Sequence, residues 1–238
     1  MVILSSLLFA QAGSAQATLE AEEIFAKSNG LYQKGDYAEA AKGYEEIIKR
    51  GIKNSTLFYN LGNAYFRNKA LGQAILNYER AKRLSPRDED IRFNLEFARA
   101  LINESKDHWW QRGLNLFSIH ELTIFTTLFY WLLMLGLIIY LFRSGPFWLR
   151  LNLAMAIIFL LSGLCLGTKI YYEQAHKPAI VLEKTAARNG PGEDYSVGIS
   201  LPEGKRVIIL NQREGWLEVG LPKEGLKGWV IEERLEEI

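Results

Sequence analysis

Two long uncharged stretches constrain this chain more than any other feature. Residues 122–142 contain no charged side chain, and neither do residues 151–168. A bilayer core roughly 30 Å thick is crossed by about 20 apolar residues in a helix, so each stretch is long enough to span. The sequence therefore predicts two transmembrane helices, at 119–142 and 151–172, joined by a loop at 143–150.

The interiors of both predicted spans lack the ionisable residues that mark ion paths and proton relays, so we expect membrane anchors rather than a channel or transporter. Ser118 and Glu121 match a capping box at the start of the first helix. In the second span, Gly163 and Gly167 form a G-x-x-x-G motif, which lets another helix approach closely. The partner of this helix-packing motif is either the first span or another membrane protein.

The N-terminus has the pattern of an export signal. An apolar stretch from Val2 to Ala10 is followed by small residues that end in Ala15-Gln16-Ala17. This order is typical of a signal peptide with an A-x-A cleavage site. We predict a signal peptide at 1–17, with an apolar leader of no such function as the alternative.

A period of 34 residues lies between the leader and the first span. The segments NGLYQKGDYAEAAKGYEEIIKRG and GNAYFRNKALGQAILNYERAKRLSP superpose with this shift, which places Tyr44 on Tyr78. The period and its pattern of small and aromatic residues resemble the tetratricopeptide repeat, with repeats at 21–54 and 55–88. The resemblance implies stacked pairs of helices.

The second repeat carries most of that family's marked positions. Its small residues let paired helices pack closely and its aromatic residues fill the space between turns. Two repeats are fewer than the three or so that usually form a stable stack, so we expect residues 88–104 to form a capping helix or half of a decayed third repeat. The array domain is then 18–105, followed by an amphipathic linker at 106–118. The marked positions are Phe58, Leu61, Gly62, Tyr65, Ala74, Tyr78, Ala81 and Pro86.

Beyond the second span the chain changes to short apolar runs separated by turn residues. The order A-R-N-G-P-G-x-x-Y, L-x-x-G-x-x-V, G-W-L-x-V and G-W-V resembles a bacterial SH3 domain over 178–238. The predicted fold class is multidomain: an all-α tetratricopeptide-repeat array, a two-helix transmembrane hairpin and a small all-β SH3-like barrel.

Catalytic and nucleic-acid-binding chemistry is not expected. The single cysteine, Cys165, lies in a span, and the three histidines are far apart and begin no metal-binding motif. No phosphate-binding loop or nucleophile elbow is present in the sequence. A formal charge of +1 without a basic block gives no footprint for nucleic acid. We expect neither an enzyme nor a bound cofactor or metal.

Recognition is the remaining class of function. On the concave face of the array, the first helix of each pair would present aromatic and amide side chains that could hold an extended peptide or a helix. The alternative is that these asparagines are ordinary repeat consensus and the aromatics only pack. The groove residues are Phe25, Asn29, Tyr32, Tyr59, Asn63, Phe66, Arg67 and Phe93.

The SH3-like module offers a second candidate site. Tyr195, Trp216 and Trp229 would line a shallow aromatic cleft for a peptide or a cell-wall stem. Equally, Trp229 would lie in the barrel core, because alternate strand residues face inward.

The orientation in the membrane depends on the leader. The loop at 143–150 carries two arginines, whereas the flanks 103–118 and 173–190 together carry five Lys and Arg residues, so the positive-inside rule decides little. With a genuine signal peptide, the array and the SH3-like module are periplasmic and the loop is cytoplasmic.

The order of these domains resembles the E component of the Bat aerotolerance operon (BatE-like). The resemblance implies a non-enzymatic scaffold in the bacterial inner membrane that works with Bat-type von Willebrand A proteins and, indirectly, a MoxR-type ATPase. The expected function is thus a membrane-anchored adaptor. Two alternatives stay open: a sensor that binds peptidoglycan, and a cytoplasm-facing chaperone adaptor with an uncleaved leader.

Overall fold

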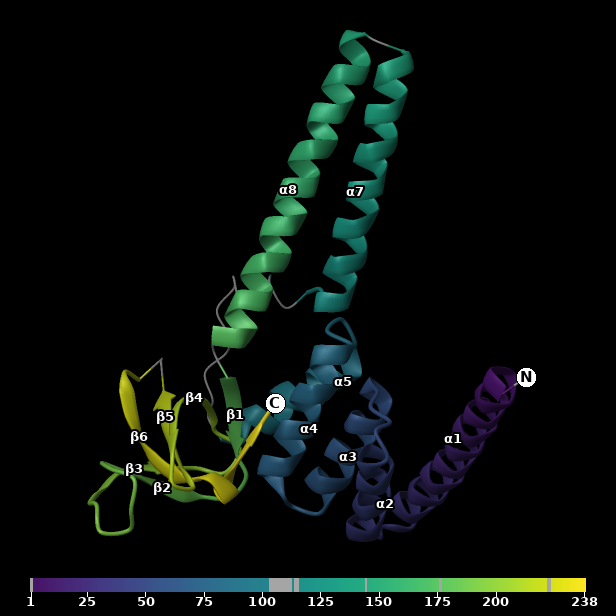
Figure 1. Ribbon diagram of the computed structural model, residues 1–238. Helices are drawn as coiled ribbons and strands as arrows, with labels where there is room; N and C mark the ends of the chain where they lie inside the picture. The colour runs from purple at the N-terminus through teal and green to yellow at the C-terminus, as the bar shows by residue number, and fades with distance from the viewer. Residues whose placement is uncertain (1, 103–112, 114–115, 144, 176, 222–223) are drawn as a thin grey trace.

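Three parts follow one another along the chain: an array of helices, a hairpin of two long apolar helices, and a β domain (Figure 1). The computed structural model describes residues 2–102, 113, 116–143, 145–175, 177–221 and 224–238, with side chains from residue 18 onward. Most of the linker expected at 106–118 lies outside these residues.

Five helices form the array, and their boundaries follow the 34-residue period. The turns after the first and third helices are formed by Gly35 and Lys69, which both have a positive φ, of 91° and 65°. Asn54 caps the third helix by accepting a 2.8 Å hydrogen bond from the Leu57 backbone N–H, as N-cap residues do. The leader expected at 1–17 continues into the first helix, with residue 1 outside the described part. The helices are α1 (Val2–Lys34), α2 (Tyr37–Lys49), α3 (Ser55–Arg67), α4 (Leu71–Leu84) and α5 (Glu89–Ala100).

Small residues set how closely these helices pack. A Cβ atom on Gly62 of α3 would lie 2.7 Å from the ring of Tyr78 on α4, so only glycine fits there. On α5, Ile91, Leu95 and Ala98 are buried, as their shared helical face predicts.

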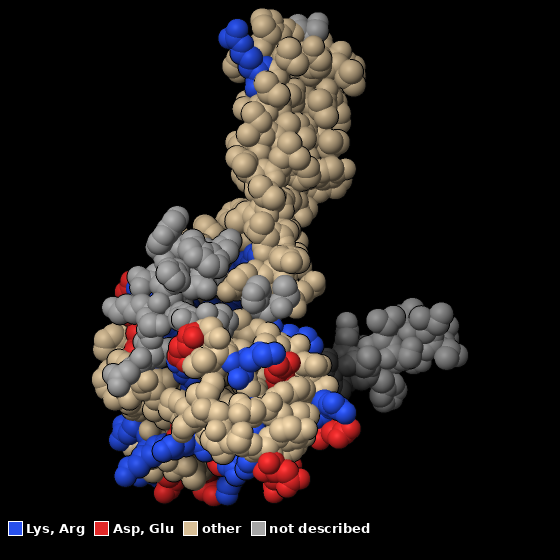
Figure 2. All heavy atoms as spheres, turned by 90° about the vertical axis from the view of Figure 1, so that its left-hand side faces the viewer, with Lys and Arg blue, Asp and Glu red and all other residues tan. Residues whose placement is uncertain are grey.

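Two further helices form the hairpin: α7 (Ile119–Phe142) and α8 (Pro146–Ala175). Both are long and apolar enough to cross a membrane, and little of their surface is buried within the protein. The predicted capping box is confirmed: Glu121 and Ser118 exchange side-chain to backbone hydrogen bonds of 2.9 and 3.1 Å. Figure 2 shows the hairpin uncharged along its length, with Lys or Arg side chains at the loop end.

The two hairpin helices approach each other closely at Gly136 of α7. The Asn152 side chain of α8 donates a 3.1 Å hydrogen bond to the Gly136 carbonyl oxygen, and its Oδ1 occupies the space that a Cβ on Gly136 would need. Gly163 and Gly167 do not pack on α7, because a Cβ on either would have no atom within 4 Å. The prediction that this motif packs on the first span is therefore wrong.

Seven short strands form one antiparallel sheet in the order β3-β2-β6-β5-β4-β1-β7. The β4–β5 turn places Glu214 and Gly215 at positive φ, as tight hairpin turns require. Inward-facing aliphatic residues such as Val207, Val219 and Val230 form the core of the domain. The strands are β1 (Lys177–Val181), β2 (Thr185–Arg188), β3 (Val197–Leu201), β4 (Arg206–Arg213), β5 (Trp216–Leu221), β6 (Leu226–Ile231) and β7 (Leu235–Glu237).

The β domain packs directly against α4 of the array (Figure 1). Ile180 of β1 is fully buried in the same apolar cluster as Ile75 of α4. The Gly72 backbone N–H donates a 2.7 Å hydrogen bond to Glu203 of the β domain. Arg80 of α4 forms a 2.7 Å ion pair with Glu236. The two domains, which the sequence predicts as separate modules, therefore share one apolar cluster in addition to their own cores.

The corner between α4 and α5 is tied to the base of the hairpin. Arg83 forms a 2.8 Å ion pair with Glu173 of α8, and Arg87 pairs with Glu121 of α7. Lys169 of α8 donates a hydrogen bond to the Phe117 carbonyl oxygen. The array and the β domain therefore lie at the same end of the hairpin, opposite its loop (Figure 1).

Candidate functional site

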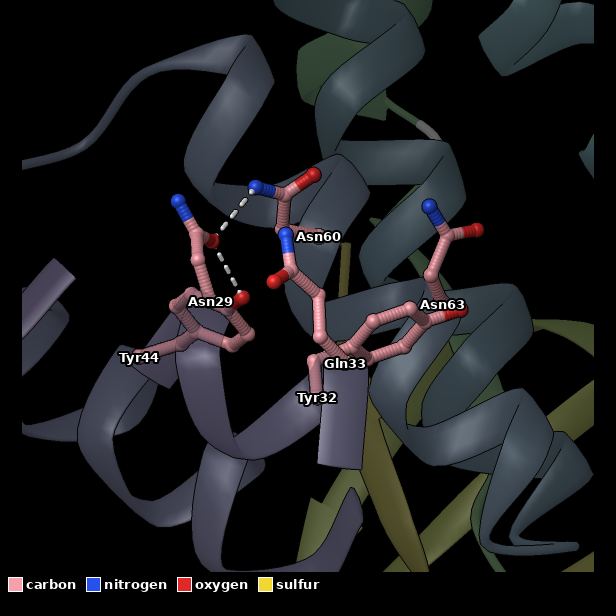
Figure 3. A pocket seen from close by; sticks show the side chains of 6 residues that line it. All are labelled: Asn29, Tyr32, Gln33, Tyr44, Asn60 and Asn63. Carbon is pink, nitrogen blue, oxygen red and sulfur yellow. Dashed lines mark hydrogen bonds between the residues drawn. The ribbon is translucent and has the colours of Figure 1, made fainter. Parts of the chain in front are cut away.

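A shallow hollow on the array, which we call the amide hollow, lies where α1, α2 and α3 meet (Figure 3). Its lining contains no charged side chain, and four of its six residues carry an amide. The lining residues are Asn29, Tyr32, Gln33, Tyr44, Asn60 and Asn63.

Asn29 is held in place by two donors. Its Oδ1 accepts a 2.6 Å hydrogen bond from the Tyr44 hydroxyl and a longer contact of 3.4 Å from the Asn60 amide nitrogen. Figure 3 draws both contacts, and the Asn29 amide nitrogen points away from Tyr44. The N–H donors of Asn29 take no part in either contact.

The same network recurs 34 residues later. Asn63 Oδ1 accepts hydrogen bonds from the Tyr78 hydroxyl at 2.7 Å and from the Asn94 amide at 2.9 Å. Asn94 also donates to the Tyr59 hydroxyl at 3.0 Å. Since the Asn63 oxygen is occupied in the same way as that of Asn29, its Nδ2 group is also left to donate outward.

Both tyrosines stay protonated donors at neutral pH. Burial raises the pKa of the Tyr44 phenol to about 12, with nearby Tyr32 as a smaller cause. Burial is likewise the main cause that raises the pKa of Tyr78. The hydroxyl protons that orient Asn29 and Asn63 are therefore retained throughout the physiological range.

Three of the eight groove residues expected from sequence line the amide hollow, and three others are half-buried. The aromatic residues Phe25, Tyr59 and Phe66 pack against neighbouring rings at centroid distances of 5.8, 6.1 and 5.8 Å. For these three, the packing role is the one observed. The residues that line the hollow are Asn29, Tyr32 and Asn63.

The remaining two groove residues differ from each other. The Arg67 guanidinium stacks over the Tyr37 ring at 4.7 Å, outside the lining of the hollow. Phe93 on α5 is 70% exposed. Sequence reasoning missed several participants, although applying the 34-residue period to every polar position of α3 and α4 would have found them. They are Gln33, Tyr44, Asn60 and Asn94.

Of the three cleft residues expected in the β domain, Tyr195 lies on a loop, and Trp216 and Trp229 lie on strands. The Tyr195 ring packs on its own loop, in the space that a Cβ on Gly190 would need. Arg188 holds that loop by donating to the backbone oxygens of Glu193 and Tyr195 at 2.8 and 2.7 Å. Tyr195 remains half-exposed at the surface.

Trp216 and Trp229 lie on the outer face of the sheet. Leu217 and Val230, their neighbours along β5 and β6, are buried in the core, and alternate residues of a strand face opposite sides. Trp216 pairs with Ile231 and Trp229 with Glu218, so the two indoles are diagonal neighbours. Of the two readings for Trp229, the core position is therefore the wrong one.

No group of three or more metal-ligating side chains occurs in the described part of the chain. No protein-family model matches the sequence, and neither does any curated protein. The functional argument therefore depends on the geometry of the amide hollow and its surroundings.

Proposed function

We propose that this protein is a non-enzymatic, membrane-anchored adaptor whose helical array is a tetratricopeptide array that binds an extended segment of a partner protein. Support comes from the recurrence of the 34-residue period in three dimensions. The turn at Gly35 recurs 34 residues later at Lys69, and the hydrogen bond that Asn29 accepts recurs at Asn63. A repeated side-chain network of this kind is what stacked identical units produce.

The single observation that carries the binding proposal is the saturation of both asparagine oxygens. Asn29 and Asn63 each accept two hydrogen bonds within the protein, so their amide N–H groups face outward as a pair. The backbone carbonyls of an extended peptide supply acceptors for such donors. An uncharged lining favours the polypeptide backbone over an anionic group.

A direct test uses the full chain in lipid nanodiscs and a phage-displayed random peptide library. We expect enrichment of bound sequences that falls at least about fivefold in Asn29→Ala and Asn63→Ala variants, as loss of a central contact predicts. Asn211→Ala, which changes an exposed amide of the β domain, is the matched control. Enrichment that is unaffected by both array variants would exclude the amide hollow as the site.

For the surroundings, we propose an inner-membrane protein with the array and an SH3-like β domain in the periplasm, after cleavage of a signal peptide. Both domains lie at one end of the hairpin, so a single orientation applies to both. The sequence from 122 to 172 contains no Asp or Glu, so Arg143 and Arg150 near the loop find no acidic partner within the hairpin. Because the positive-inside rule decides little here, the proposed orientation rests on the signal peptide.

Thiol labelling tests this orientation. Ser144→Cys is placed in a Cys165→Ser background and compared with Thr56→Cys, at an exposed position of the array. A membrane-impermeant reagent applied to spheroplasts should label position 56 and spare position 144. The reverse pattern would establish the cytoplasm-facing chaperone adaptor. By resemblance, the partners are Bat-type von Willebrand A proteins.

One observation favours a second candidate, a sensor that binds peptidoglycan. Trp216 and Trp229 are half-buried neighbours on the outer sheet face, and indoles there can stack on saccharide or peptide groups with the part that stays exposed. Retention of the detergent-solubilised chain on purified peptidoglycan, lost in Trp216→Ala but not in Asn29→Ala, supports the sensor. Equal retention of Trp216→Ala and the unmodified chain removes it.

A further inference from the structure

The groove proposed above continues beyond the amide hollow onto α5. Asn94 of α5 donates to Asn63 as Asn60 donates to Asn29. The first contact is the second one shifted by 34 positions along the chain. The ring of Phe97 packs edge-on against Phe66 of α3 at 5.8 Å. Asn94, three residues before Phe97, thus joins α5 to the hollow at Asn63.

The side chains along the proposed groove change from amides on α1 and α3 to apolar residues on α5. One period after Asn29 and Asn63 stands Phe97, and one period after Arg67 stands Leu101. Phe93, Phe97 and Leu101 recur every four residues and therefore share one side of the helix. They are 70%, 51% and 57% exposed. We call this set the α5 apolar face.

The α5 apolar face is not the surface on which another helix pair would stack. In the second repeat, α4 covers the side of α3 that carries Gly62, and the equivalent position of α5 is Glu96. Glu96 is exposed, whereas Arg99 faces the preceding helix, where it pairs with Glu79 of α4. A charged side of this kind ends a stack of repeats. The apolar residues face the groove instead.

Acidic residues border the α5 apolar face. Glu89 and Asp90 form the exposed first turn of α5, four and three residues before Phe93. The closest basic group to Glu89 within the described residues is Arg92 of the same helix, at 3.8 Å. Exposed carboxylates beside exposed aromatic rings complement a ligand that carries both a cation and apolar side chains.

We propose that the partner segment held by this groove is apolar and basic: its backbone lies along the amide hollow, its apolar side chains cover Phe93, Phe97 and Leu101, and a Lys or Arg lies against Glu89 and Asp90. This inference rests on the proposed peptide-binding function and adds the class of ligand. An exposed apolar area that adjoins a polar groove is the usual form of such a site.

The test reads the composition of the peptides selected from a random library by the full chain in nanodiscs. We expect enrichment of Leu, Ile, Phe and Trp together with Lys or Arg. The Phe93→Ser/Phe97→Ser variant should lose the apolar enrichment at least about fivefold, as removal of aromatic anchors predicts. Glu89→Gln/Asp90→Asn should lose only the basic enrichment. Val197→Ser, at another exposed apolar position, is the matched control.

The outcomes separate the two proposals. If the unmodified chain selects no peptide that depends on Asn29 or Asn63, both proposals are wrong. If the selected peptides depend on those asparagines but are polar or acidic, or are indifferent to Phe93→Ser/Phe97→Ser, only the ligand class is wrong. Self-association that disappears in Phe93→Ser/Phe97→Ser would assign the face to a second copy of the chain instead. Quenching of a Phe93→Trp variant by brominated lipid would assign it to the bilayer.

Discussion

Replacement of Gly72 by alanine should separate the β domain from the array. Gly72 lies in the first turn of α4, where the β domain comes closest. A Cβ at this position would be 2.5 Å from the Leu182 carbonyl oxygen and 2.7 Å from that of Val181. Both atoms belong to backbone that cannot turn aside, so either the helix or the β domain must shift.

The expected cost follows from what such a shift disturbs. Overpacking against fixed atoms costs about 1–3 kcal/mol. The Gly72 N–H also donates to the Glu203 carboxylate, and a hydrogen bond to a charged group contributes about 1.5–3 kcal/mol. Alanine favours the helix over glycine by up to about 1 kcal/mol, which offsets part of this. We expect a net loss of about 1.5–6 kcal/mol in the free energy that holds the two domains together.

Hydrogen–deuterium exchange of the full chain in nanodiscs measures this effect locally. In Gly72→Ala, exchange should accelerate in α4 and β1, where Ile75 and Ile180 lose their shared cluster. Gly30→Ala is the matched control, because a Cβ on Gly30 would have no atom within 4 Å, and this change should stabilise α1. Unchanged protection of α4 and β1 in Gly72→Ala would refute the packed interface.

Three further predictions concern the turns, the hairpin and the buried phenols. Lys69→Gly should raise the free energy of unfolding by about 1 kcal/mol, because glycine adopts a positive φ without strain, and Gly35→Ala should lower it by a similar amount; urea titration of the full chain measures both. Gly136→Leu should force apart α7 and α8, because Asn152 occupies the space beside Gly136; disulfide cross-linking of engineered cysteine pairs along the helices should slow, and an unchanged rate would contradict this contact. The Tyr44 phenol has a folded-state pKa of about 12, above its unfolded value near 10, so its contribution to stability is present below pH 10 and is lost as the pH rises toward 12. Urea titrations between pH 9 and 12 should show a shallower decline of stability in Tyr44→Phe than in the unmodified chain, and equal slopes would disprove it.

Local patterns in the sequence predicted the elements well. The uncharged run before Arg143 and the capping box at Ser118 indicated the first hairpin helix, and α7 begins and ends within the expected bounds. Such features depend on neighbouring residues, whose spacing a single sequence records directly. The short apolar runs between turn residues coincide with β1, β4, β5 and β6, whereas β2 and β3 were not predicted.

The candidate site was predicted only in part. Asn29 and Asn63 were found because they stand on the first helix of each repeat, but their side chains are held by Tyr44 and Tyr78, which lie fifteen residues further on. Phe25, Tyr59 and Phe66 pack against rings of neighbouring helices. The spacing of residues within one helix does not predict which of them a neighbouring helix covers. Phe97 was missed for this reason.

The sequence by itself determined the order of the parts: helical array, apolar hairpin and β strands, because helical, apolar and turn preferences act over short distances. Only the tertiary structure decided how those parts meet. Gly72 and Val181 are more than one hundred positions apart, and nothing in either local pattern marks them as neighbours. The free energy gained by burying apolar surface depends on the area removed from water and not on how far apart the residues lie in the sequence. It therefore united the array and the β domain into one body, and left the α5 apolar face open beside the amide hollow.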